Sequence, residues 1–123
     1  LFLIIFLHEL FIETRYSEIA VNNGNAEILK LLLSKKKFDD LNDHLNLYDA
    51  IRGNKFETCK VLLSIPDYDI NKQFIYFNET PLFTAIKYER MNIIKFLLSK
   101  PQIDVNKINI DLFIFESDFN LKI

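Results

Sequence analysis

The sequence predicts an all-helical solenoid, in which short helical hairpins repeat along the chain and stack side by side. Two observations carry this prediction. A long pattern of residues occurs three times in the same register, and every copy is followed by the same short motif. Half of the 123 residues are apolar and 26% are charged, which is enough apolar surface for a folded core.

The repeated segments are AVNNGNAEILKLLLS (20–34), AIRGNKFETCKVLLS (50–64) and AIKYERMNIIKFLLS (85–99). Each begins with alanine, carries a lysine in its second half and ends in Leu-Leu-Ser. An aspartate, an aliphatic residue and an asparagine then follow at 40–42, 69–71 and 104–106. A register kept three times indicates internal repeats, which fix the architecture of the chain.

A turn is predicted in the middle of each copy, four residues after the first alanine. Gly24 and Asn54 stand there in the first two copies, and both residue types accept the left-handed backbone that ends a helix. Glu89 stands there in the third copy and fits this conformation less well. Each copy is therefore expected to hold two helices joined by a tight turn.

The second helix of each copy is apolar on most of its circumference, with its lysine on the surface. Such a helix needs neighbours on both sides, which stacked repeats provide. The first alanine of each copy is small enough to let adjacent first helices approach closely. In the third copy, Thr80 is expected to cap the first helix and Pro81 to occupy its first turn.

At this point the chain resembles the ankyrin repeat family. The resemblance is carried by TPLFTA (80–85), IIKFLL (93–98) and DVN (104–106), and by GNAEILKLLL (24–33) in the first copy. It covers about residues 16–107. It implies antiparallel helix pairs with protruding β-hairpin fingers, stacked into an L-shaped solenoid. It also implies protein–protein recognition without catalysis or a cofactor.

The chain departs from the family pattern at several positions. Phe83 replaces the usual histidine after Pro-Leu, so the hydrogen bonds of that histidine to the loop are expected to be absent. Pro66 and Pro101 stand near positions where the family prefers glycine. Fewer residues separate Asn42 from Ala50 than Asn71 from Ala85, so the first finger is expected to be short or missing.

The predicted division follows the repeats. Residues 1–14 form a partial repeat, 15–43, 44–77 and 78–107 are repeats 1 to 3, and 108–123 are a degenerate repeat or tail. Because the chain begins with leucine, we expect a piece of a longer array, whose further repeats or partner cover its apolar ends. Residues 1–7 are interpreted as a buried helix end, and a truncated signal anchor is the alternative. For residues 108–115 the alternative to a degenerate helix is a strand or disordered tail.

The resemblance implies that a partner contacts the finger tips and the concave face of the first helices. The matching positions are Tyr76, Phe77, Glu79, Lys87, Tyr88, Arg52, Asn22 and Asn23. Exposed aromatic residues are favoured anchors at interfaces, so Tyr76, Phe77 and Tyr88 are the leading candidates. The alternative is that Tyr76 or Phe77 packs on an adjacent finger.

No catalytic residue, cofactor or metal site is predicted. Cys59 is expected in the core and cannot form a disulfide within the chain. His8 and His44 have no ligand-like neighbours, and the acidic residues at 39, 40 and 43 lack the alternation of a calcium loop. The basic run at 35–37 is interpreted as a solvated cluster at the end of a helix.

The expected partner is a protein, bound by a monomeric module. A net charge of −2 with no basic stripe argues against nucleic acid. The apolar run 1–7 is too short to span a bilayer, which takes about 20 residues. A single cysteine and no clear signal peptide favour the cytoplasm. The alternatives are a targeting arm of a larger enzyme, such as a kinase or ubiquitin ligase, and a truncated product without function.

Overall fold

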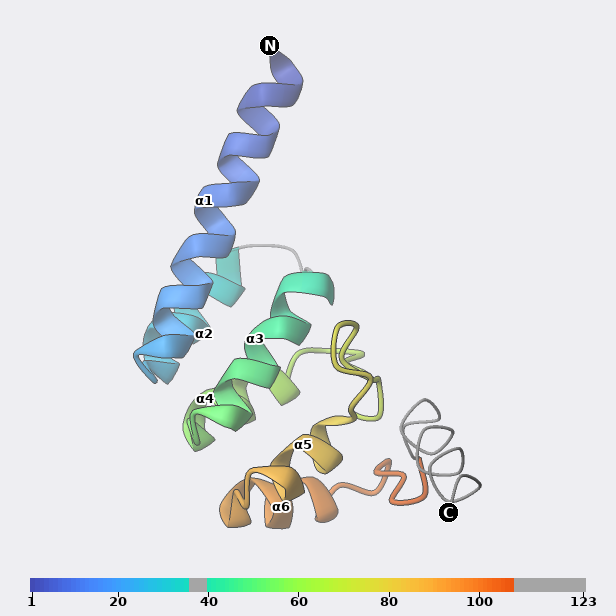
Figure 1. Cartoon of the computed structure of the whole chain (residues 1–123). Coiled ribbons are helices and arrows are strands. Elements are labelled where there is room, and N and C mark those ends of the chain that lie inside the picture. Colours follow the sequence, from blue (N-terminus) through green and yellow to red (C-terminus); the bar gives the residue numbers. More distant parts are fainter. Residues whose placement is uncertain (36–39, 108–123) are drawn as a thin grey trace. The chain divides into compact units, whose positions relative to one another are not determined.

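The computed structural model describes residues 1–35 and 40–107, with the side chains of 9–14 and 40–45 left out (Figure 1). The chain divides into two compact units, Leu1–Tyr68 and Asp69–Ile123. All six helices of the described residues are α-helices, and these residues contain no strand. The prediction of an all-helical chain is therefore confirmed for this part.

The first unit consists of two helical hairpins. Helix α1 (Phe2–Asn22) packs against α2 (Ala26–Lys35), and α3 (Asp40–Arg52) packs against α4 (Phe56–Leu63). The hairpins also contact one another, α1 against α3 and α2 against α4 (Figure 1). The first helices of the two repeats therefore lie beside one another, and so do their second helices, as the repeat pattern predicts for this unit.

The second unit holds one described hairpin, formed by α5 (Pro81–Lys87) and α6 (Met91–Leu98). Thr80 caps α5, because its hydroxyl oxygen accepts the backbone N–H of Phe83 at 3.2 Å. Pro81 occupies the first turn of α5, where a missing N–H leaves no hydrogen bond unmade. Both expectations for the start of this helix are confirmed.

The three turns between first and second helices share one backbone geometry. Gly24, Asn54 and Glu89 all have positive φ, at 67°, 56° and 57°. The residue after each of them donates its N–H to the carbonyl of the repeat's first alanine, as in Asn25 to Ala20 at 2.9 Å. This pattern is the Schellman motif, which satisfies carbonyls that the helix end leaves free.

Buried positions recur in each repeat. The first alanines, Ala20, Ala50 and Ala85, are buried, as expected for points of close helix approach. Leu29 and Cys59 are equivalent positions on the second helices and are also buried. In the third copy the equivalent residue, Ile94, is half-buried, and its neighbour Ile93 is buried instead. The core thus follows the repeat register at the first alanines and at this position of the first two copies.

The serine of each Leu-Leu-Ser stretch lies at or near the end of its second helix. Ser34, Ser64 and Ser99 donate their hydroxyls to the carbonyl three residues earlier, at 2.7, 2.7 and 2.6 Å. Helix ends leave carbonyls unpaired, and a nearby hydroxyl satisfies one of them. Ser64 and Ser99 follow directly after α4 and α6, whereas Ser34 is the next-to-last residue of α2.

The loop before α5, residues 69–80, contains turns where a β-hairpin finger was expected, and no strand is assigned to it. Asp69 accepts the N–H of Asn71 at 2.9 Å. The Asn71 side chain donates to the Gln102 carbonyl and accepts the Asp104 N–H, both at 2.8 Å. The two Asp-aliphatic-Asn motifs of the second unit are therefore joined by one asparagine side chain.

The beginning of the chain differs from the expectation. Residues 2–7 belong to α1, which runs without a break through the boundary predicted after residue 14. The side chains of residues 1–7 are exposed in this structure, whereas a buried helix end was expected. No helix of the described residues is long and apolar enough to cross a bilayer.

Helix α3 begins at Asp40, so the first Asp-Leu-Asn motif lies inside a helix and not in a loop. Because α2 ends at Lys35, few residues remain between the two helices, and the prediction of a short or missing first finger is confirmed. Residues 108–123, for which a degenerate helix or a tail was expected, lie outside the described residues.

Candidate protein-binding surface

The loop before α5 is closed by backbone hydrogen bonds at its base, which we call its neck, and carries three apolar residues, 75–77, at its tip. The N–H of Phe74 donates to the carbonyl of Glu79 at 2.8 Å, and the N–H of Asn78 donates to the carbonyl of Phe74 at 2.8 Å. The Phe74 side chain is fully buried. Between these anchors, Ile75, Tyr76 and Phe77 are 53%, 71% and 42% exposed. The neck therefore presents three consecutive apolar side chains to solvent.

Glu79 is not the exposed contact that the resemblance implied. The residue is only 7% exposed, and both of its carboxylate oxygens are bonded within the chain. Oε2 accepts the hydroxyl of Thr84 at 3.0 Å, and Oε1 accepts Nζ of Lys87 at 2.7 Å. Glu79 thus ties the end of the loop to α5.

Lys87 and Tyr88 lie next to this bond at the end of α5. The hydrogen bond that Lys87 donates to Glu79 raises the pKa of Lys87. Desolvation lowers this pKa by a smaller amount, and the charge of the Glu79 carboxylate raises it a little further. Lys87 Nζ also stands 5.5 Å from the centre of the Tyr88 ring. Since cations favour the faces of aromatic rings, this contact helps to hold both side chains.

Asn22, Asn23 and Arg52 lie in the first unit, where they are exposed at the ends of α1 and α3. Arg52 forms an ion pair with Asp49, with 3.3 Å between Nη2 and Oδ1. Since α1 packs against α3, these residues belong to adjacent first helices, as the resemblance implied.

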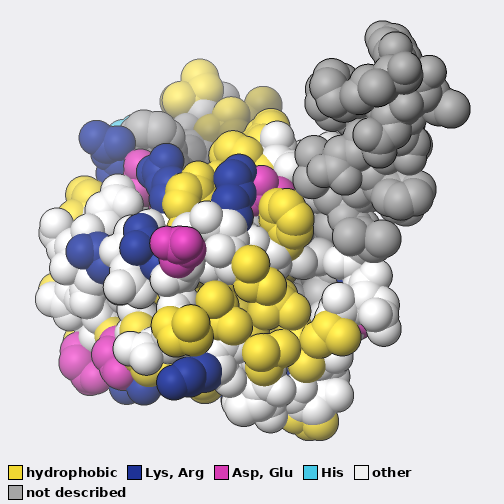
Figure 2. Space-filling model, turned by 60° about the horizontal axis from the view of Figure 1, so that its bottom comes forward, with side chains coloured by type: hydrophobic (Ala, Val, Ile, Leu, Met, Phe, Trp, Pro, Cys, Tyr) yellow, Lys and Arg dark blue, Asp and Glu magenta, His cyan; other side chains and the backbone are white. Residues whose placement is uncertain are grey.

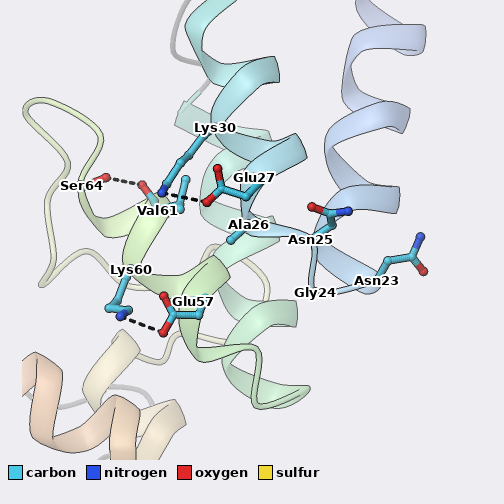
Figure 3. A pocket seen from close by; sticks show the side chains of 10 residues that line it. All are labelled: Asn23, Gly24, Asn25, Ala26, Glu27, Lys30, Glu57, Lys60, Val61 and Ser64. Atoms are coloured by element: carbon cyan, nitrogen blue, oxygen red, sulfur yellow. Dashed lines mark hydrogen bonds and ion pairs between the residues drawn. The ribbon is translucent and has the colours of Figure 1, made fainter.

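The first unit also has a shallow depression of about 650 Å³ that the sequence reasoning missed (Figure 3). It lies between α2 and α4, together with the turn before α2. Two ion pairs stand along it, Glu27–Lys30 at 3.2 Å and Glu57–Lys60 at 2.8 Å. The recurring Glu-x-x-Lys spacing in the first two copies was the available signal. Because both pairs are solvent-exposed and already neutralised, they do not form a reactive set.

Cys59, the single cysteine, is a core residue, as predicted. The side chain is fully buried, and this burial raises its pKa to about 12. The thiolate is the nucleophilic form, so a thiol held neutral at physiological pH does not act as a nucleophile. Within the described residues, no three His, Cys, Asp or Glu side chains are grouped so that they could hold a metal ion.

The remaining sequence-based candidates are placed only in part. His8 is exposed on α1, and Lys35 is exposed at the end of α2. The rest of the basic run, at 36 and 37, and the side chains of the acidic cluster and of His44 lie outside the described residues.

Hydrophobic side chains also stand among the charged ones on the face drawn in Figure 2. An exposed apolar side chain is common on protein surfaces, so exposure alone does not mark a site. What distinguishes Ile75, Tyr76 and Phe77 is that they are consecutive and that the loop carrying them is anchored at both sides of its neck.

The family model described as ankyrin repeats (3 copies) matches residues 17–109. The chain therefore belongs to the ankyrin repeat family, whose members generally serve as protein–protein interaction modules and are generally not catalytic. No curated protein and no solved structure matches the chain significantly.

Proposed function

We propose that this chain is a protein-binding module that recognises its partner through the loop tip at 75–77 and the adjoining end of α5. The observation that carries the proposal is the anchored loop, whose three exposed apolar side chains include Tyr76 and Phe77. A partner that covers this tip removes apolar area from water without having to order a flexible segment.

Tyr88 and Lys87 extend this surface in the second unit. Tyrosine offers a large apolar body with a polar end, which explains its frequent use as an interface anchor. Lys87 is partly neutralised by Glu79, so its role is to orient Tyr88 and to supply a hydrogen-bond donor at the edge of the contact.

Arg52, Asn22 and Asn23 are proposed as partner contacts of the first unit, on the exposed ends of its first helices. Stable interfaces bury about 800 Å² on each partner, which is more than a single loop tip supplies. Contacts beyond the loop tip are therefore expected to contribute to binding.

The experiment compares partner capture by the wild-type chain with that by a Tyr76→Ala/Tyr88→Ala variant. We expect the variant to recover at least tenfold less partner, since aromatic anchors cost about 2 kcal/mol or more each when truncated. Tyr16→Ala is the matched control, because Tyr16 is an exposed tyrosine on α1, outside the proposed surface. Equal recovery by wild type and double variant, or an equal loss in the control, would show that the surface lies elsewhere.

A further inference from the structure

The turn between α1 and α2, residues 23–25, contains an asparagine directly followed by a glycine. Of the two glycines in the chain, Gly24 follows Asn23 and Gly53 follows Arg52. The side-chain amide of an asparagine is open to attack by the backbone nitrogen of the next residue, and glycine has no Cβ to hinder that attack. An electrophile and a nucleophile therefore stand next to each other along the chain at this turn.

The reaction exchanges one amide bond for another and is one reason why asparagine is thermally labile. Once its proton has passed to hydroxide, the backbone nitrogen of Gly24 bonds to Cγ of Asn23. The bond from Cγ to the side-chain nitrogen breaks, and this nitrogen takes a proton from water and leaves as ammonia. Water then opens the five-membered imide. Opening at Cγ gives aspartate, and opening at the main-chain carbonyl gives isoaspartate, in which the backbone runs through the former side chain.

The folded turn holds the two groups in a geometry that does not react. In the imide ring, Cβ of Asn23 and the nitrogen of Gly24 are nearly eclipsed about the bond from Cα to the carbonyl carbon. Asn23 has a ψ of −7°, so its own backbone nitrogen takes that eclipsed place instead. The N–H of Gly24 is also bound to the carbonyl of Val21 at 2.9 Å. Both the torsion and the hydrogen bond have to be released before the ring closes.

Access of water does not limit the reaction. Asn23 is exposed, and its side chain points away from the depression between α2 and α4 (Figure 3). The closed backbone of the turn is therefore the barrier that the fold adds. Short surface turns open locally at a lower free energy than the whole domain unfolds.

The two neighbouring asparagines lack this arrangement. Asn22 precedes Asn23 and Asn25 precedes Ala26, so the attacking residue carries a Cβ in both cases. Asn25 also uses its side chain to cap α2, since Oδ1 accepts the N–H of Ile28 at 3.1 Å. Both asparagines serve as internal controls within the same segment.

We propose that Asn23 is a site of spontaneous deamidation, and that the closed turn of the first repeat controls its rate. The modification accumulates in molecules whose turn has opened, so it records how long the first hairpin has been loosened. It is independent of the proposed function, because it takes place in the chain without a partner.

The product does not fit the closed turn. Isoaspartate lengthens the backbone where the N–H groups of Gly24 and Asn25 bind carbonyls of α1, both at 2.9 Å. Aspartate and isoaspartate each add a negative charge at the C-terminal end of α1, which the helix dipole disfavours. The turn is also tightly packed, because a Cβ built on Gly24 would lie 3.1 Å from Cδ of Lys55. Deamidation is therefore expected to loosen the first hairpin further.

The test follows the whole chain in mildly alkaline buffer, folded and in guanidinium chloride, with sodium chloride matching the ionic strength in the folded sample. Peptide mass spectrometry locates the modified asparagine, and electron-transfer fragmentation distinguishes isoaspartate from aspartate. We expect Asn23 to be modified at least about tenfold faster in the unfolded chain, because the closed turn is lost there. Asn22 and Asn25 should react much more slowly. Asn23→Gln should remove the fast site, since its ring would have six members.

Leu29→Ala and Leu31→Ala connect this rate to the first hairpin. Leu29 is fully buried on α2, so its truncation loosens the hairpin and should speed deamidation of the folded chain by at least about tenfold. Leu31 is 68% exposed on the same helix, and its truncation should leave the rate unchanged. Equal rates at Asn23 in folded and unfolded chains, or equal effects of the two variants, would overturn the proposal. So would an unfolded chain in which Asn23 reacts no faster than Asn22 and Asn25.

Discussion

At the scale of single residues, three different side chains occupy one backbone conformation. Gly24, Asn54 and Glu89 have nearly the same positive φ, and each is followed by the same hydrogen bond to an alanine carbonyl. Glycine adopts this conformation without steric cost, asparagine with little, and other residues with a clear penalty. The glutamate in the third repeat is therefore a local weakness of an otherwise shared turn.

Replacing Glu89 by glycine should stabilise the chain. Removal of the side chain relieves the left-handed backbone, and we expect the free energy of unfolding to rise by about 1 kcal/mol in urea titrations. Gly24→Ala is the reverse change and should lower stability, since its Cβ would stand 3.1 Å from Cδ of Lys55 as well. A destabilised Glu89→Gly variant would mean that the glutamate makes a contact that outweighs its backbone penalty.

At the scale of elements, the loop before α5 is connected to that helix by a carboxylate. The sequence lacks the family histidine at Phe83, and hydrogen bonds from it to the loop were expected to be absent. In the structure, Glu79 binds both Thr84 and Lys87 across the loop and the helix. A different side chain thus holds the loop, so the exposed tip has a fixed base.

Glu79→Ala should loosen this loop. The Thr84 hydroxyl is buried and would lose its acceptor, so we expect a loss of about 1–3 kcal/mol in the free energy of unfolding. Hydrogen exchange at the Phe74 amide, which closes the loop neck, should become faster. Glu57→Ala is the control: its ion pair with Lys60 is exposed, and exposed pairs contribute about 1 kcal/mol or less.

The Lys87 bond gives this contribution a pH dependence. Because the folded pKa of Lys87 is raised, the stabilisation is complete below the ordinary value of 10.5 and is lost as the pH rises through the folded pKa. Glu79→Ala should therefore lose less, relative to wild type, in strongly alkaline solution. Equal differences at neutral and strongly alkaline pH would show that the Lys87 bond contributes nothing to folding.

At the scale of the whole molecule, the repeat register predicted the fold well because it records which positions are buried. Ala20, Ala50 and Cys59 were all placed correctly in the core from their spacing. The register said little about Glu79, because its burial depends on a lysine eight residues later and on the path of a loop. The repeat register also did not predict that α1 is continuous from Phe2 to Asn22. Residues 1–7 are all apolar, so they show no alternation of polar and apolar residues from which a helix and its exposed face could be recognised.

The contact between adjacent hairpins has a consequence for stability in the first unit. Helix α4 packs on α2 as well as on α3, so the two hairpins share one apolar seam. In stacked repeats each unit is stabilised by its interface with the next, and a defect in one is felt by its neighbour. Loosening α4 should therefore also loosen α1 and α2.

Leu62→Ala tests this coupling. Leu62 is fully buried on α4, and a leucine-to-alanine change in a core costs about 2–5 kcal/mol through lost contacts and the cavity left behind. We expect faster amide exchange in α4 and also at Leu29 in α2. Leu31→Ala, at an exposed position of α2, should change stability by about 0.5 kcal/mol or less. If α4 loosens while exchange in α2 is unchanged, the hairpins fold independently, and the shared seam contributes little to holding them together.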